Sequence, residues 1–223
     1  MDFNLIVQPL FLSFKTVGCS LILFIVLGIP TAYILSKKDL AYKWLWETLI
    51  TLPLIFPPIA IGFLLLMLLG KKGWIGAYFY AIDIRFIFEF KGLVIAGFIA
   101  GLPLMVKPLQ SAIEAFPKAI SEAAYLSGKN EFQTFLHVIL PCIKSSLLAA
   151  LLIASARALG EVGITLMLGG NIVGKTDTIS LAIYNAVFDG EYELAMVLCG
   201  VLVAISIVVF IGLNYFQKKE KFV

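Results

Sequence analysis

Two oppositely charged residues, Arg157 and Glu161, lie four positions apart within an apolar stretch of the chain. Residues at this spacing share one face of a helix, so their side chains can meet. A charge surrounded by apolar residues at membrane depth is costly unless it is paired or faces water. Two interpretations follow: a structural ion pair, or an arginine that faces a polar pathway and eases the passage of an anion.

A second pattern has the form of a phosphate-binding loop. Residues 169–176 read GGNIVGKT and fit G-x-x-x-x-G-K-[ST]. A working loop of this kind follows a buried parallel strand and opens a helix in an α/β domain, with a magnesium-binding aspartate on another strand. The surrounding sequence offers no place for such a domain, so we predict that residues 169–176 do not bind nucleotide.

The number and spacing of the cysteine and histidine residues do not suit a metal site or a nucleophilic catalytic site. Cys19, Cys142 and Cys199 are far apart in apolar segments and form no C-x-x-C pair, which predicts neither a disulfide framework nor a metal site. His137 is the only histidine, which removes most zinc sites and histidine-based catalytic schemes. We expect no catalytic residue, no metal site and no cofactor in this chain.

The composition indicates a membrane protein. Hydrophobic residues make up 61% of the 223 residues and charged residues 14%, whereas soluble domains carry about 25% charged residues. Apolar runs of about 20 residues match the hydrocarbon layer that a helix must cross. We therefore predict an all-α fold, a polytopic bundle of about five transmembrane helices that forms a single domain over residues 1–223. The predicted spans are residues 10–35, 48–70, 92–114, 138–168 and 193–216.

The fourth of these windows, 138–168, is so long that part of it must leave the bilayer or tilt strongly. Several prolines lie within the predicted spans: Pro53, Pro57, Pro58, Pro103 and Pro108. In a membrane helix they are tolerated where neighbours or water satisfy the freed carbonyls. These prolines are expected either to kink the helices next to a cavity or to serve packing alone. Lys15, Lys107 and Glu114 lie near span ends, where we expect their side chains to extend to the interface.

The distribution of basic residues predicts the orientation, because cytoplasmic segments carry the excess of lysine and arginine. With the N-terminus outside and the C-terminus inside, the inner segments hold Lys37, Lys38, Lys43, Lys118, Lys129, Lys218, Lys219 and Lys221. The outer segments then hold Lys71, Lys72, Arg85, Lys91 and Lys175. The basic residues form no single stripe, so a nucleic-acid partner is not expected.

Between the third and fourth spans, residues 116–137 carry the signals of two short capped helices. Pro117 suits the first position of a helix, and Gly128 suits the left-handed position just past its end. Asn130 can cap a second helix, with Gln133 three residues on as in a capping box. We predict a helix-turn-helix elbow on the cytoplasmic face.

Such an elbow could dock against another protein. Ala123 and Ala124, beside Glu122, are small enough for a close approach, while Tyr125 and Leu126 supply apolar anchors. The alternative is an amphipathic connector that rests on the lipid surface.

The residues of this elbow resemble a family motif. Residues 122–141 fit E-A-A-x3-G-x9-I-x-L-P, the EAA loop of bacterial and archaeal ABC importer permeases, with Val138 in place of isoleucine. In that family the loop docks into a groove of a separate ATP-binding subunit, which holds the ATP and magnesium. The resemblance implies this coupling role for Glu122, Ala123, Ala124, Tyr125, Gly128, Leu140 and Pro141.

Other segments narrow the resemblance. Residues 52–58 (LPLIFPP), 156–163 (ARALGEVG) and 170–176 (GNIVGKT) are similar to molybdate permeases. Sulfate relatives share related signatures, and Val162 and Val173 stand where Phe and Pro are common. The resemblance therefore implies import of an oxyanion and favours molybdate, with sulfate or tungstate as alternatives. The residues that we expect along the translocation pathway are Pro57, Pro58, Arg157, Gly160 and Glu161.

The resemblance also implies an assembly in the cell membrane of a prokaryote. The expected partners are a second copy of the chain, an ATP-binding cassette ATPase and an extracytoplasmic oxyanion-binding protein. One rival interpretation is a secondary carrier driven by an ion gradient, which would predict inverted repeats and ionisable residues at the midplane. A membrane-embedded enzyme is the other, although no nucleophile, base and orienting group converge in the sequence.

Overall fold

The computed structural model describes residues 4–220, and the side chains of residues 5–212. Within that range the regular structure is entirely helical, which confirms the predicted all-α class. Three helical segments are long and apolar enough to cross a membrane: Leu5–Ser36, Phe90–Glu114 and Tyr192–Gly212. The first comprises α1 (Asn4–Leu23), the π-turn η1 (Phe24–Gly28) and α2 (Ile29–Ser36), the second is α6, and the third lies in α13 (Tyr192–Glu220).

Two further candidate spans are bent pairs of helices. Helices α3 (Lys43–Ile55) and α4 (Pro58–Leu69) are bent by 119° relative to each other at the break between them. Residues Phe56 and Pro57 at this break have extended backbones, as expected for residues that each precede a proline. If each bent pair is one span, the described residues contain five, the number that the sequence predicts.

The second bent pair joins Glu131–Cys142 to α10 (Lys144–Leu159) at 79°. The first half of this pair comprises α8 (Glu131–Thr134), the π-turn η2 (Phe135–Ile139) and α9 (Leu140–Cys142). The predicted window 138–168 is therefore not one helix: it contains this bend near Ile143 and ends its long helix at Leu159. Gly160 favours the second break, and α11 (Gly163–Gly169) then begins in a new direction.

Helix α6 forms the centre of the bundle. Twelve of its residues are buried, and it packs against α1, α2, α3, α10 and α11. Small residues permit these close contacts: a Cβ atom on Gly101 would lie 2.7 Å from the carbonyl oxygen of Ala154 on α10. Such small residues are typical of interfaces between membrane helices, where backbones must approach closely.

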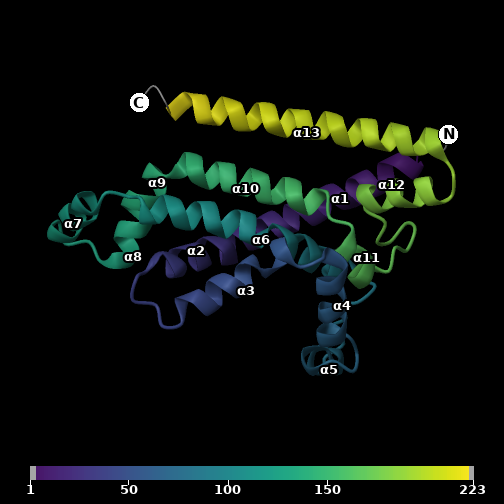
Figure 1. The fold of residues 1–223 in the computed structure, drawn as a ribbon, viewed down its shortest axis with the longest axis horizontal. Helices are drawn as coiled ribbons and strands as arrows, with labels where there is room; N and C mark the ends of the chain where they lie inside the picture. Colours follow the sequence, from purple (N-terminus) through teal and green to yellow (C-terminus); the bar gives the residue numbers. More distant parts are fainter. Residues whose placement is uncertain (1–3, 221–223) are drawn as a thin grey trace.

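Shorter helices lie around this centre. Helices α4 and α5 (Trp74–Ala81) project away from the bundle, whereas α7 (Lys118–Leu126) lies near one end of α6 and α12 (Ile179–Phe188) near the other (Figure 1). Helix α13 lies along the outside against α10 and α12. Most of its described side chains are exposed and apolar, as expected for a helix whose main neighbour is lipid. Three of the basic residues used to predict the orientation have side chains outside the described residues: Lys218, Lys219 and Lys221.

Candidate functional site

The predicted elbow is a turn between α7 and α8. Helix α7 begins at Lys118, one residue later than Pro117 would suggest. At its end the amide of Lys129 donates to the carbonyl of Ala124, and the amide of Gly128 to that of Tyr125. These two hydrogen bonds form a Schellman motif. The motif requires a left-handed residue just past the helix end, and Gly128 has this conformation, with φ of 82°.

The second elbow helix begins with the predicted capping box. The Asn130 side chain accepts from the Gln133 amide at 2.8 Å, and the Gln133 side chain accepts from the Asn130 amide at 3.1 Å. These two bonds satisfy amides that the helix itself leaves unpaired. The local geometry of the turn is therefore determined by Gly128 and Asn130.

The outer face of the elbow is apolar and open. We define the elbow surface as the exposed side chains of Ile120, Tyr125, Leu126 and Phe132. Leu126 is 90% exposed, whereas Ala124 is the one buried residue of α7. An exposed apolar patch of this kind fits either docking to another protein or contact with the lipid surface, the two interpretations given above.

The other residues of the motif have separate positions. Glu122 and Ala123 are exposed beside the elbow surface. Leu140 packs against the main core cluster, and Pro141 lies exposed in the first turn of α9, just before the 79° bend. The elbow is thus joined directly to the bend that leads into α10.

The elbow is also attached to the first span. The Glu131 carboxylate lies 2.7 Å from Lys37 Nζ and accepts a 2.8 Å hydrogen bond from the Tyr33 hydroxyl. The rings of Tyr33 and Phe135 lie with their centroids 4.1 Å apart. Helix α2 therefore makes a polar contact with the start of α8 and an aromatic contact with the start of η2.

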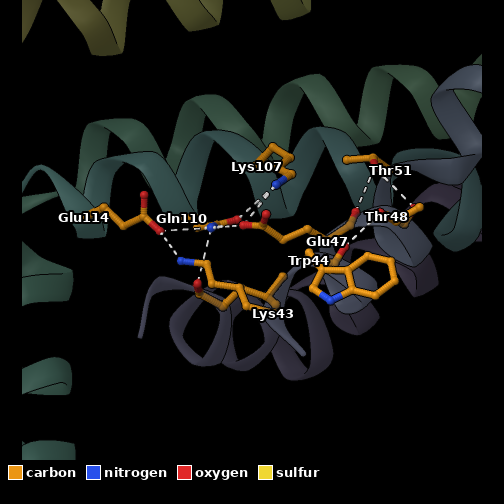
Figure 2. Close-up of polar contacts among 9 residues, drawn as sticks. Lys43, Trp44, Glu47, Thr48, Thr51, Lys107, Gln110 and Glu114 are labelled. Carbon is orange, nitrogen blue, oxygen red and sulfur yellow. Dashed lines mark hydrogen bonds and ion pairs between the residues drawn. The ribbon is translucent and has the colours of Figure 1, made fainter. Parts of the chain in front are cut away.

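A polar network joins α3 to α6 close to the elbow (Figure 2). Gln110, only 4% exposed, occupies its centre. Its Nε2 atom lies 2.7 Å from a Glu47 oxygen, 3.0 Å from a Glu114 oxygen and 3.2 Å from the Leu35 carbonyl oxygen. One amide thus links the ends of α2, α3 and α6.

Two ion pairs complete this network, Lys43 with Glu114 at 2.9 Å and Lys107 with Glu47 at 3.4 Å. Sequence reasoning missed the network, because it assigned Lys107 and Glu114 to the interface independently. One signal was available: residues 107, 110 and 114 have the spacing of a single helix face. Their partners on α3 become apparent only in the fold.

Arg157 and Glu161 form an ion pair of 2.6 Å across the break between α10 and α11. The Glu161 side chain is 2% exposed, and its second oxygen accepts a 2.8 Å bond from the amide of Ile164 in the first turn of α11. The Arg157 side chain is 31% exposed. Glu161 therefore serves both as the partner of Arg157 and as a cap for α11.

The predicted pathway residues gather at this break. A Cβ atom on Gly163 would lie 2.8 Å from Pro58 Cβ, so α11 crosses the start of α4 in close contact. Pro57 is exposed beside it, and Gly160 is exposed between α10 and α11. The two prolines from the α3–α4 break and the residues of the α10–α11 break thus belong to one region of the fold.

The phosphate-loop pattern lies between α11 and α12. Helix α11 precedes it, in place of the strand that a phosphate-binding loop requires. Thr176 donates to the Gly169 carbonyl and accepts from the Ile172 amide, both at 2.8 Å. The threonine that would bind magnesium in a nucleotide site instead closes its own loop.

A pocket of about 710 Å³ lies at the N-terminal end of α6, lined mainly by residues that precede this helix in the sequence. Lys71 and Arg85 lie over the ring of Tyr80, at 4.9 and 5.3 Å from its centroid. Lys72, Lys175 and Glu89 also line the pocket, and Glu89 pairs with Lys175 at 2.7 Å, so the lining keeps an excess of positive charge. This cationic pocket and the elbow lie at opposite ends of α6.

Comparison with known proteins identifies the class. Residues 24–221 match the family described as the binding-protein-dependent transport system inner membrane component, and the chain belongs to this family. A solved bacterial alginate ABC transporter contains a chain with a TM-score of 0.75 and 18% identity, over 98% of this chain and 80% of that one. The chain is therefore a permease subunit of an ABC importer and not an enzyme, as the sequence predicts.

Its relatives include oxyanion permeases. The molybdenum transport system permease protein ModB of Haemophilus influenzae is 32% identical over 93% of this chain and 92% of its own length. The sulfate transport system permease protein CysW of Synechocystis is 31% identical over 82% of this chain and 66% of its own. The transport system permease protein NifC of Clostridium pasteurianum is 32% identical over 82% of this chain, which spans 64% of NifC.

Proposed function

We propose that this permease imports an oxyanion and that molybdate is its substrate, with tungstate or sulfate as alternatives. The likeness to ModB over nearly the whole of both chains carries this proposal. The cationic pocket supports it, because an excess of positive charge on a surface raises the local concentration of anions there.

The test of the substrate is transport by the complete system. The chain, its ATPase and its binding protein are placed in proteoliposomes, and ATP-dependent uptake of molybdate, tungstate and sulfate is measured. We expect molybdate to be taken up and to compete against the other two. Uptake of sulfate alone would contradict the molybdate assignment, and no ATP-dependent uptake of any oxyanion would contradict the proposal as a whole.

We further propose that two copies enclose the pathway and that each elbow binds one ATPase subunit. Closed symmetric dimers are the commonest homo-oligomers, and the alginate system of similar fold is an ABC transporter in complex with a periplasmic protein. ATP would draw the two ATPases together and move the elbows, so that the pathway opens toward the extracytoplasmic binding protein. Hydrolysis would return it to the inward-facing state.

The exposure of the elbow surface supports this coupling and suggests its test. Leu126→Asp should abolish co-purification of the ATPase, because a charge replaces an apolar contact at a 90% exposed position. Ile172→Asp, at an exposed apolar position in the α11–α12 loop, is the matched control. Normal ATPase retention and uptake in Leu126→Asp would contradict the coupling role.

The proposed orientation has the elbow inside and the α11–α12 loop outside. Single cysteines are introduced at Leu126 and Val173, which are 90% and 72% exposed, in a chain lacking its own cysteines. A maleimide that cannot cross the membrane should label Val173→Cys in intact cells and Leu126→Cys only after lysis. The reverse pattern would invert the orientation and remove the elbow from any cytosolic ATPase.

A further inference from the structure

The segment from Glu114 to Glu131, which contains α7, is tied at both of its ends to the same turn of the chain. The elbow follows Glu114 at the end of α6, and its second helix begins at Glu131. Lys43 Nζ lies 2.9 Å from Glu114, and Lys37 Nζ lies 2.7 Å from Glu131. Lys37 and Lys43 flank the turn between α2 and α3. We call these two ion pairs the two-point clamp.

Between the two points the turn and the elbow are separated by an open groove of about 860 Å³. Lys38, Asp39, Lys118 and Ser121 are among its lining residues. The two-point clamp therefore spans this groove from both ends.

Each point of the clamp continues into the bundle. Glu131 also binds the Tyr33 hydroxyl on α2, and Glu114 also binds Gln110. Gln110 in turn reaches Glu47 on α3 and the Leu35 carbonyl on α2. Figure 2 shows this second point, with Lys43 of α3 directed toward Glu114 at the end of the network. A displacement of the elbow thus acts on α2 and α3 through side chains at both ends.

The ion pairs are placed for transmission rather than for stability. The four side chains of the clamp are 27% to 58% exposed. Ion pairs as open as these contribute little to global stability, because water screens them and long side chains must be immobilised. The packed core around α6 holds the bundle together without them.

We infer that Lys37 and Lys43 are positioning residues that make the α2–α3 hairpin move with the elbow. The inference rests on the proposed function, in which the ATPase displaces the elbow. The elbow is covalently joined to α6 and to the bend before α10, and the two-point clamp adds a direct polar connection to α2 and α3, which also pack on α6. All four segments then change position together when ATP binds.

Charge reversal and charge exchange test this inference. In proteoliposomes with the ATPase and the binding protein, molybdate taken up per ATP hydrolysed is measured for Lys37→Glu and Lys43→Glu. We expect each reversal to lower this ratio about fivefold, the lower range of coupling between distant sites. The exchanges Lys37→Glu with Glu131→Lys and Lys43→Glu with Glu114→Lys should restore part of it, because they re-form the ion pairs but not the bonds of Tyr33 and Gln110 to the two carboxylates.

Lys38→Glu is the matched control, because Lys38 lies in the same turn, is exposed and makes no ion pair among the described side chains. Its ratio should equal that of the wild type. Lys37→Gln and Lys43→Gln serve where a reversal fails to assemble, and should lower the ratio in the same direction. A merely structural role would change the amount of assembled complex and leave uptake per ATP unaltered.

The outcomes separate the two proposals. Wild-type ratios in the reversals or the glutamine variants overturn the inference and leave the proposed function intact. The inference is also overturned, with the proposed function intact, if the exchange variants assemble normally but recover none of the uptake per ATP hydrolysed. A wild-type system that takes up no oxyanion overturns the proposed function, and the inference falls with it.

Discussion

Glu161 joins two helices through one carboxylate, since one oxygen pairs with Arg157 at the end of α10 and the other accepts the amide of Ile164 in α11. The side chain is almost completely buried, whereas Arg157 is about one-third exposed. The direction of α11 relative to α10 is therefore held by this residue. Removing Arg157 alone and removing both charges should therefore have different effects on stability and on uptake.

Removing one member of the pair should be more damaging than removing both charges. Arg157→Gln leaves a buried carboxylate without its partner, which costs about 3 kcal/mol. Changing Glu161→Gln as well removes the unpaired charge and should recover most of this loss. Thermal unfolding in detergent measures both variants, with Glu193→Gln, an exposed residue at the start of α13, as the control. Equal unfolding temperatures for the single and the double variant would contradict the prediction.

The same double variant separates the two roles that Arg157 can have. If Arg157 serves only the ion pair, the recovered double variant should transport at nearly the wild-type rate. If its exposed part faces the anion, uptake should remain low although the protein is stable, because the favourable charge along the pathway is lost. We expect uptake to remain at least tenfold below wild type, about 1.4 kcal/mol of barrier. Wild-type uptake would remove the pathway role.

The contact of α4 with α11 should not tolerate even one added methyl group. A Cβ atom at Gly163 would lie 2.9 Å from the backbone nitrogen of Ile59, and one at Gly62 would lie 3.0 Å from Ile164 Cα. Each glycine-to-alanine change should therefore lower stability by about 1–3 kcal/mol through overpacking. Gly18→Ala, where no atom lies within 4 Å, should leave the unfolding temperature unchanged or raise it slightly. Neutral effects at Gly163 and Gly62 would mean that the two helices are not in contact.

Loss of the capping box should loosen the elbow without affecting the bundle. Asn130→Ala removes the acceptor of the Gln133 amide and should cost about 1 kcal/mol in the local stability of α8. Hydrogen exchange at the amides of residues 131–134 should become about fivefold faster, while exchange in α6 stays the same. Lys129→Ala, an exposed neighbour whose side chain makes no bond in the capping box, is the control. Unchanged exchange in α8 would show that the cap does not hold the helix.

The loop after α11 should become less stable as the pH rises. Burial raises the pKa of the Asp177 carboxyl above its usual range, although the amides of Gly174 and of Asp177 itself partly oppose this shift. Between the unfolded pKa of about 3.9 and the raised folded pKa, the folded state binds more protons than the unfolded state, so stability falls with increasing pH. Asp177→Asn keeps an oxygen for the Gly174 amide and should remove this dependence. Thermal unfolding at several pH values compares the two, and parallel curves would contradict the assignment.

Local signals in the sequence predict the elbow well. Gly128 and Asn130 occupy positions where few other residues would suffice, so the left-handed turn and the capping box appear in the structure where the sequence indicates them. The apolar runs likewise predict helices of membrane-crossing length, since a membrane helix must be apolar over a fixed length. Whether the motif residues bind an ATPase is a prediction that transport experiments must test.

Relationships between distant segments were harder to predict. The window 138–168 is mostly apolar, and hydropathy does not register a bend between apolar helices. Likewise, the partners of Gln110 come from residues 63 and 75 positions away, which no helical periodicity connects. Hydropathy and capping predict what one segment does by itself, whereas these contacts depend on how segments pack.

Helix α13 makes the protein responsive to its lipid. Its apolar span, Tyr192–Gly212, has 21 residues and extends over about 31 Å, close to the roughly 30 Å of a typical hydrocarbon layer. Its main contacts are with α10 and α12, so a thinner bilayer is accommodated mainly by a larger inclination of this one helix. Acyl-chain length therefore sets the inclination of α13 against α10, the helix whose last turn holds Arg157, and membranes of different thickness impose different resting geometries on the same chain.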